Sequence, residues 1–204
     1  MCAGKATRHF FFNIQMSEYT SHGMYEPSQR FDQYTVAIKG ECYMYGGLSL
    51  HFAKTKEAVS STISIFNQCT ERWRIEKTTG TPPEGLYDGA CCSDPSGNFY
   101  LYGGNAGSNT FHGGLYKLSS KTFEWKTLSA ESDLSGPAMK VGCGMVCFMK
   151  DKLALFGGFG LPAITPQEGS SFSGTINTGW TNDLHFFDTK EGILMRGYFI
   201  FNHK

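Results

Sequence analysis

Three stretches of the chain share one pattern, in which alternating apolar residues are followed directly by two glycines. The stretches read "ECYMYGG", "NFYLYGG" and "KLALFGG" and end at Gly47, Gly104 and Gly158. They recur at intervals of roughly 55 residues, a period typical of chains built from repeated supersecondary units. This repeat restricts the fold more than any other feature of the sequence.

Each glycine-ended stretch is one of several short apolar runs with strand character. A run precedes it ("YTVAI", "GACCS", "GMVCFM") and another follows it ("STISIFNQ", "GGLYKLSS", "NDLHFFDT"). In the first two units a fourth run surrounds Trp73 or Trp125. Four short strands at a period near 50 are typical of β-propeller blades. We therefore expect an all-β chain of about three blades, each with four antiparallel strands, and we place them at 30–80, 81–134 and 135–195.

A phosphate-binding loop is the competing interpretation of a strand that ends in glycines. Such a loop opens onto a helix, so 10 or more residues with helical periodicity should follow each glycine pair. "FGLPAITPQEG" contains two prolines instead, and a helix interior does not tolerate proline. The glycines are therefore expected to be architectural.

The paired glycines and the tryptophans have distinct expected roles. Glycine can leave a strand with a positive φ and lets another backbone approach closely. The tryptophans are expected to fill the space between adjacent blades. The structural positions are Gly46, Gly47, Gly103, Gly104, Gly157, Gly158, Trp73 and Trp125.

Three blades are too few for a closed ring, since propellers typically have 4–8 blades. The third unit also loses its ending, because "ILMRGYFIFNHK" contains no Trp. This ending, with its tail 196–204, and the N-terminal segment 1–29 could each supply one strand to a neighbouring sheet, but we expect the chain to be part of a larger propeller. The open blade faces and edges predict self-association.

Composition and cysteine usage exclude several classes of partner. Lys plus Arg and Asp plus Glu number 18 each, so the net charge is zero, which disfavours a nucleic-acid or anionic-membrane binder. "HFFFNI" is too short to span a bilayer. Seven cysteines without a C-x-x-C pair indicate reduced thiols and a cytoplasmic or nuclear location.

No catalytic residue, metal ligand or cofactor site can be assigned from the sequence. The six histidines form no H-x-x-x-H or H-x-E pair. Cys143 and Cys147 would share one face of a strand; a redox pair and two core thiols both fit that spacing, and we favour core thiols. We expect a protein that is not an enzyme.

The stretch from Phe159 to Trp180 is the most informative functional feature, because it forms a long loop between the second and third strands of its unit. Long irregular loops in compact domains often carry function. Trp180 belongs to a residue type enriched at interaction hot spots. It could equally pack the loop onto its own blade.

"NDLHFFDTKEG" and "GGLYKLSSKTFEW", with the Gly-Gly strands, resemble kelch repeats over roughly residues 30 to 195. "KDKLALFGGFGLP" and "GWTNDLHFFDT" resemble more narrowly the family of kelch domain-containing protein two, whose members are substrate receptors of cullin-RING ubiquitin ligases. Their six-bladed propellers hold substrate C-termini, often ending in glycine. The resemblance places Phe159 and Trp180 in the peptide pocket, with Phe159 where the family usually has Tyr.

The chain departs from that family in ways that affect function. "RFDQ" at 30–33 replaces the family's "RSGH" and keeps only Arg30. The family's carboxylate-binding arginines lie in later blades, and its ligase-docking helix follows them, so this chain alone is expected to bind substrate C-termini weakly. A generic kelch scaffold, such as a small-GTPase effector or cytoskeletal adaptor, is the alternative. A kelch-type enzyme is a remote third class, because it would need converging His, Glu or Asp residues.

Overall fold

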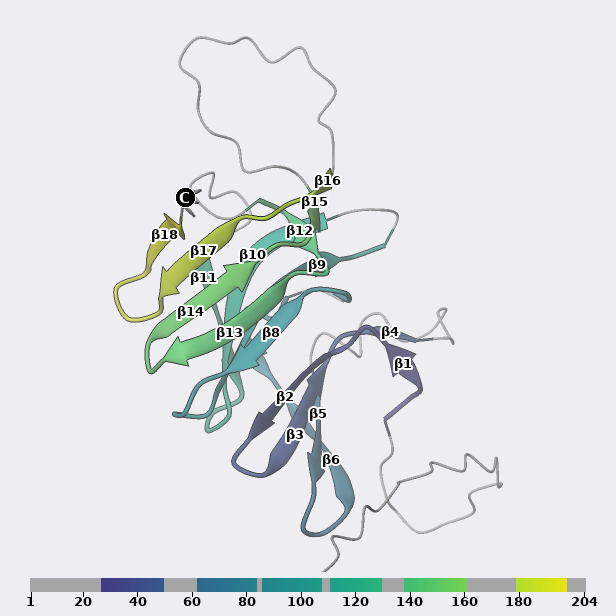
Figure 1. Cartoon of the computed structure of the whole chain (residues 1–204). Helices are drawn as coiled ribbons and strands as arrows, with labels where there is room; N and C mark the ends of the chain where they lie inside the picture. The colour runs from purple at the N-terminus through teal and green to yellow at the C-terminus, as the bar shows by residue number, and fades with distance from the viewer. Residues whose placement is uncertain are drawn as a thin grey trace, which may run out of the picture.

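The computed structural model describes residues 27–49, 62–83, 86–107, 111–129, 138–160 and 179–197. Most of these residues lie in three larger sheets that follow one after another (Figure 1), and the rest of the described strands form two small sheets. No helix occurs in these ranges, and hence none that could cross a membrane. The expected all-β, incomplete propeller is confirmed.

In every blade the spatial order of the four main strands is their order along the chain. Blade 1 contains β2 (Tyr34–Ile38), β3 (Glu41–Tyr45), β5 (Thr62–Asn67) and β6 (Arg72–Lys77). Blade 2 contains β8 (Ala90–Ser93), β9 (Asn98–Asn105), β10 (Phe111–Ser119) and β11 (Glu124–Ser129). Blade 3 contains β13 (Gly144–Met149), β14 (Lys152–Phe156), β17 (Leu184–Asp188) and β18 (Ile193–Gly197).

Short strands extend the blades beyond this pattern. β7 (Thr79–Gly80) runs parallel to β11 and adds a fifth strand to the edge of blade 2. At the end of blade 1 where the glycine pair lies, β1 (Arg30–Phe31) pairs with β4 (Leu48–Ser49), which follows that pair. β12 (Lys140–Val141), β15 (Phe159–Gly160) and β16 (Gly179–Trp180) form a further small sheet. In each blade the glycine pair lies at one end of the second strand. We call this end of the three blades the Gly-Gly rim.

The first glycine of a pair makes room for the linker that leads to the next blade. Gly46 and Gly103 both have φ near +65°, a conformation that disfavours side chains. A Cβ on Gly46 would collide with the carbonyl oxygen of Leu86, and one on Gly103 would collide with that of Lys140. The repeated glycines are therefore required by close backbone approach as well as by the turn.

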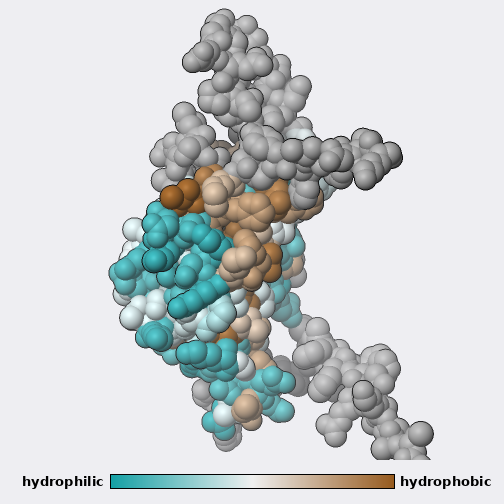
Figure 2. Space-filling view, turned by 60° about the vertical axis from the view of Figure 1, so that its left-hand side comes forward, coloured by the Kyte–Doolittle hydropathy of each residue, from teal (hydrophilic) through white to brown (hydrophobic). Residues whose placement is uncertain are grey.

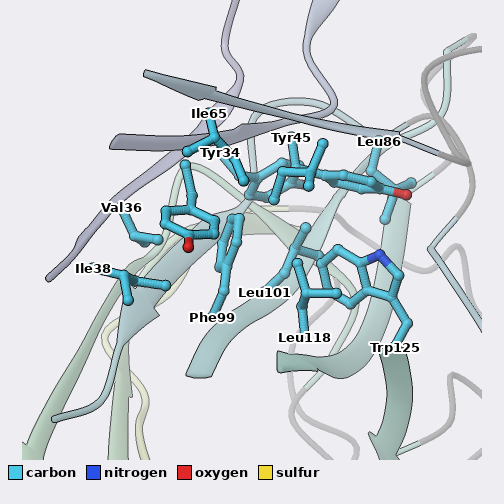
Figure 3. Packing of buried hydrophobic residues seen from close by; sticks show 12 residues of the cluster. Tyr34, Val36, Ile38, Tyr45, Ile65, Leu86, Phe99, Leu101, Leu118 and Trp125 are labelled. Carbon is cyan, nitrogen blue, oxygen red and sulfur yellow. The ribbon is translucent and has the colours of Figure 1, made fainter. Parts of the chain in front are cut away.

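The core between blades 1 and 2 is predominantly apolar (Figure 3). Trp125 on β11 is 1% exposed and packs beside Phe99 of its own blade. Its ring also contacts that of Tyr45 on β3 of blade 1. The structure thus places Trp125 between two blades.

A second core joins blades 2 and 3. Tyr100, Tyr102 and Leu115 of blade 2 meet Leu155 and Phe187 of blade 3. Successive side chains on a strand point to opposite faces, so the middle sheet contributes to both cores.

The third unit has its fourth strand although its ending lacks a tryptophan, and the idea that residues 193–197 could supply a strand to a neighbouring sheet is wrong. Ile193–Gly197 forms β18, which pairs antiparallel with β17 of the same blade and not with a neighbouring sheet. Leu194 stands opposite Phe187 just as Trp125 stands opposite Leu118 and Trp73 opposite Phe66. A smaller apolar residue thus occupies the tryptophan position.

The turn after the third strand is capped in the same way in all three blades. The side-chain oxygens of Asn67, Ser119 and Asp188 each accept hydrogen bonds from the backbone N–H groups two and three residues further on. Such local bonds are the reason that Asn, Asp and Ser favour turns.

Backbone hydrogen bonds also tie the blades together where each one begins. The N–H of Asp88 donates to the carbonyl of Asp32 at 2.9 Å, and the N–H of Gly142 donates to that of Asp88 at 2.8 Å. The hydroxyl of Tyr34 donates to the carbonyl of Gly103 at 2.8 Å. Neighbouring blades are therefore joined by directional bonds as well as by apolar packing.

Candidate binding site on the Gly-Gly rim

Phe159 and Trp180, which lie 21 positions apart in the chain, form a direct cross-strand pair. Their ring centroids are 5.3 Å apart in an edge-to-face arrangement, a geometry that aromatic pairs prefer. The backbone N–H of Thr181 donates to the carbonyl of Gly158 at 2.9 Å and closes the short ladder. The structure therefore brings the two predicted site residues together; the residues between Gly160 and Gly179 lie outside the described part.

Phe111, at the start of β10, extends this pair across two blades. Its ring centroid is 6.1 Å from that of Phe159, with the planes at 84°. We call Phe111, Phe159 and Trp180 the aromatic row. The row runs from blade 2 to blade 3 along the Gly-Gly rim, and Trp180 at its end is 82% exposed.

A buried ion pair holds the residues that follow the aromatic row in the chain. Lys140 on β12 is completely buried, and its Nζ donates to Thr181 Oγ1 at 3.0 Å and to Asp183 Oδ2 at 3.1 Å. His185 Nε2 lies 3.9 Å from the same carboxylate oxygen. Removing one partner of such a pair leaves an uncompensated buried charge, so this contact fixes the residues that directly follow Trp180.

Sequence reasoning missed Phe111, Lys140 and Asp183 as parts of this site. Asp183 lies in "NDLHFFDT", a stretch that resembles a kelch repeat, but nothing in the sequence indicates that Lys140 is its partner. Lysine is almost never fully buried unless it is paired, and the pair becomes visible only once β12 is placed beside the segment after β16.

A small pocket lies between blades 2 and 3. Its walls are mostly apolar and include Leu115, Met145, Leu155 and Leu194; His185 and Ser129 also border it. It is continuous with the core that joins the two blades, and we assign no ligand to it.

The cysteines beside this interface are poor nucleophiles. Burial raises the pKa of the Cys143 thiol to about 11 and that of Cys92 to about 12. The thiolate is the reactive form, and it is scarce at neutral pH for both residues. Within the described ranges, no cluster of three or more His, Cys, Asp or Glu side chains could hold a metal ion.

Antiparallel four-stranded blades, each with a Gly-Gly turn, are the blades of an incomplete propeller of the kelch class. Residues 33–195 match the KLHDC2/KLHL20/DRC7 Kelch-repeats domain. The chain belongs to this family.

Individual relatives are more distant. The chain is 28% identical to human Kelch domain-containing protein 3 over 167 residues, which cover 79% of this chain and 41% of that protein. It is 29% identical to human Kelch domain-containing protein 1 over 128 residues, 58% of this chain and 30% of that protein. Human Host cell factor 1 is 24% identical over 167 residues, 81% of this chain and 8% of that protein. The chain thus spans about two fifths of Kelch domain-containing protein 3 and less of the other two.

Proposed function

We propose that this chain is a protein-interaction module that binds an extended peptide segment on its Gly-Gly rim, across the aromatic row. The single observation that carries the proposal is the exposure of Trp180 at the end of a row of three aromatic rings. Exposed tryptophans beside other aromatics are typical anchors of interfaces.

The row is suited to binding because its support is rigid. Phe159 is held by strand pairing to Val141 on one side and to Trp180 on the other. The Lys140–Asp183 ion pair fixes the residues that directly follow Trp180. Strand pairing leaves the backbone of the row little freedom to lose when a partner binds, which favours affinity.

The more specific form of the proposal is recognition of a substrate C-terminus by a ubiquitin-ligase receptor. The kelch resemblance at "KLALFGGFG" and "GWTNDLHFFDT" supports it. A free carboxylate is best recognised by an arginine fork. Arg30 donates instead to the carbonyl of Gly46 and to Ser28, so we expect this chain alone to bind a C-terminus weakly.

A kelch scaffold without a ligase role is the second candidate. It is favoured by the match to Host cell factor 1, which covers 81% of the chain, against 79% for the match to Kelch domain-containing protein 3. The two candidates differ in whether binding depends on a free peptide carboxylate.

Fluorescence anisotropy with labelled peptides would test the proposal. A peptide library presented to the 204-residue chain identifies ligands, and each ligand is measured against Trp180→Ala and Phe159→Ala. Loss of an anchor aromatic is expected to cost more than ~1 kcal/mol, about a fivefold weaker Kd. Met149→Ala is the matched control, because Met149 is an exposed apolar residue of blade 3 at the end opposite the rim.

The outcomes separate the candidates. Ligands that bind equally well to the wild type, Trp180→Ala and Phe159→Ala would refute the rim as the site. Equal affinity for a glycine-ended peptide and its C-terminal amide would support the scaffold. Tight binding of the free acid alone would support C-terminal recognition and contradict our expectation of weak binding.

A further inference from the structure

The outer face of blade 3 exposes apolar side chains, whereas the equivalent faces of blades 1 and 2 are buried against the next blade. This leading face, the face directed away from blade 2, carries Val146, Phe148, Phe156, Phe186, Ile193 and Met195. Five of them are 45–53% exposed, and Phe186 contacts the ring of Phe148. Figure 2 brings forward the side of the molecule where β17 and β18 lie, and a band of hydrophobic residues runs down it.

Strand register shows what this face is built to contact. Tyr45, Tyr102 and Phe156 each directly precede the glycine pair of their blade. Tyr45 and Tyr102 are each 1% exposed because the next blade covers them, whereas Phe156 is 50% exposed. The leading face of blade 3 therefore repeats the position that forms the other two interfaces.

The opposite end of the stack carries the complementary surface. The trailing face, on the side of blade 1 away from blade 2, includes Phe66 and Trp73, with ring centroids 5.0 Å apart, and the exposed Ile75. Phe66 and Trp73 occupy the register positions of Leu118 and Trp125, which form the trailing side of blade 2. Blade 1 thus has large apolar side chains at the same strand positions that blade 2 packs against blade 1.

Among the described residues, no linker crowds the corresponding glycine of blade 3. Leu86 and Lys140 crowd Gly46 and Gly103, but the atom nearest to a Cβ on Gly157 would be the carbonyl oxygen of Thr181, 3.4 Å away. Gly157 keeps the positive φ of its counterparts although no described linker passes beside it.

We propose that two copies of this chain join head to tail, with the leading face of blade 3 of each copy against the trailing face of blade 1 of the other. The occupant is a second copy because one chain carries both halves of the repeated interface. Two copies give six blades, within the 4–8 blades that propellers typically have. Head-to-tail contacts form a ring where the rotation between copies closes and an open filament where it does not; the proposed dimer is the closed form.

Sedimentation equilibrium or light scattering of the 204-residue chain at micromolar concentration tests the proposal. The expected mass is twice 22.6 kDa. Phe156→Asp on the leading face and Trp73→Asp on the trailing face should each give a monomer. Val146→Asp and Ile75→Asp change more exposed residues of the same two faces and serve if the first variants unfold, which far-UV circular dichroism reports.

Met149→Asp is the matched control: it introduces the same charge at an exposed residue in the β13–β14 turn of blade 3 and should stay dimeric. Mixing the Phe156→Asp and Trp73→Asp variants should recover part of the dimer, because one intact contact remains between them. A monomeric wild type would overturn the proposal. A dimer that persists in both trailing-face variants would indicate contact between two leading faces, and a ladder of larger species would indicate an open filament; either result also overturns it.

Discussion

The indole ring of Trp125 lies 4.8 Å from the ring of Tyr45, at an interplanar angle of 56°, so one side chain of blade 2 closes the core of blade 1. The same Tyr45 donates its hydroxyl proton to the carbonyl of Pro83 in the linker between the blades, at 2.5 Å. Tyr102 repeats this bond with Ala138 in the following linker, at 2.6 Å. Blades 1 and 2 are therefore each completed by residues that come later in the chain.

Trp125→Ala should remove the largest buried side chain from the first core. We expect the free energy of unfolding to fall by about 3–5 kcal/mol, the usual cost of truncating a buried aromatic. Urea denaturation followed by circular dichroism measures it. Trp180→Ala, the same change at an exposed position, should stay within about 0.5 kcal/mol of the wild type; equal losses in both variants would show that Trp125 does not occupy an inter-blade core.

Tyr34→Phe should weaken the junction between blades 1 and 2. The Tyr34 hydroxyl is buried and donates to the carbonyl of Gly103; its removal leaves that acceptor without this donor. A loss of about 1–3 kcal/mol is expected from urea denaturation. An unchanged unfolding midpoint would mean that the bond contributes nothing to stability.

The same tyrosine predicts a loss of stability in alkali. Burial, reinforced by neighbouring acidic groups, raises the pKa of Tyr34 well above its usual value of 10. Folding favours the neutral phenol, so its contribution is complete below about pH 10 and is lost as the pH rises further. Thermal unfolding between pH 8 and 11 should show a steeper decline for the wild type than for Tyr34→Phe. Parallel curves would exclude Tyr34 as the source.

Asp188 predicts the behaviour in acid. Its hydrogen bond from Lys152 and two backbone N–H bonds, from Lys190 and Glu191, lower its pKa to about 2. Since an unperturbed Asp has a pKa near 3.9, the stabilisation is present above that pH and is lost as the pH falls towards 2. Thermal midpoints between pH 6 and 2 should fall less for Asp188→Asn than for the wild type. An identical fall in both proteins would contradict this assignment.

Much of the fold could be predicted because the sequence pattern repeats once in each blade. The strand that ends in Gly-Gly fixes one element of each blade, and alternation fixes which face is buried. β18 could not be predicted in the same way, because Leu194 carries no signal comparable to Trp73 or Trp125 and only its pairing with Phe187 reveals the position.

The site was predicted in part. Phe159 and Trp180 flank a long insertion, and the structure pairs them. Phe111 comes from the preceding blade, and Lys140 is buried against Asp183; neither relationship leaves a pattern along the chain, because each depends on how strands from separate units meet. Whether the aromatic row binds a peptide stays a prediction.

The contacts of Gly46 and Tyr45 with the following linker also imply that the blades are completed in the order in which the chain is synthesised. Blade 1 is complete in sequence at Lys77, yet Pro83, Leu86 and Trp125, which cover its open side, come later in the chain. A ribosome releases the N-terminal residues first, so each newly made blade waits with an uncovered apolar face until its successor emerges. Translation pauses between blades would therefore lengthen the period in which this chain is open to chaperones and to aggregation.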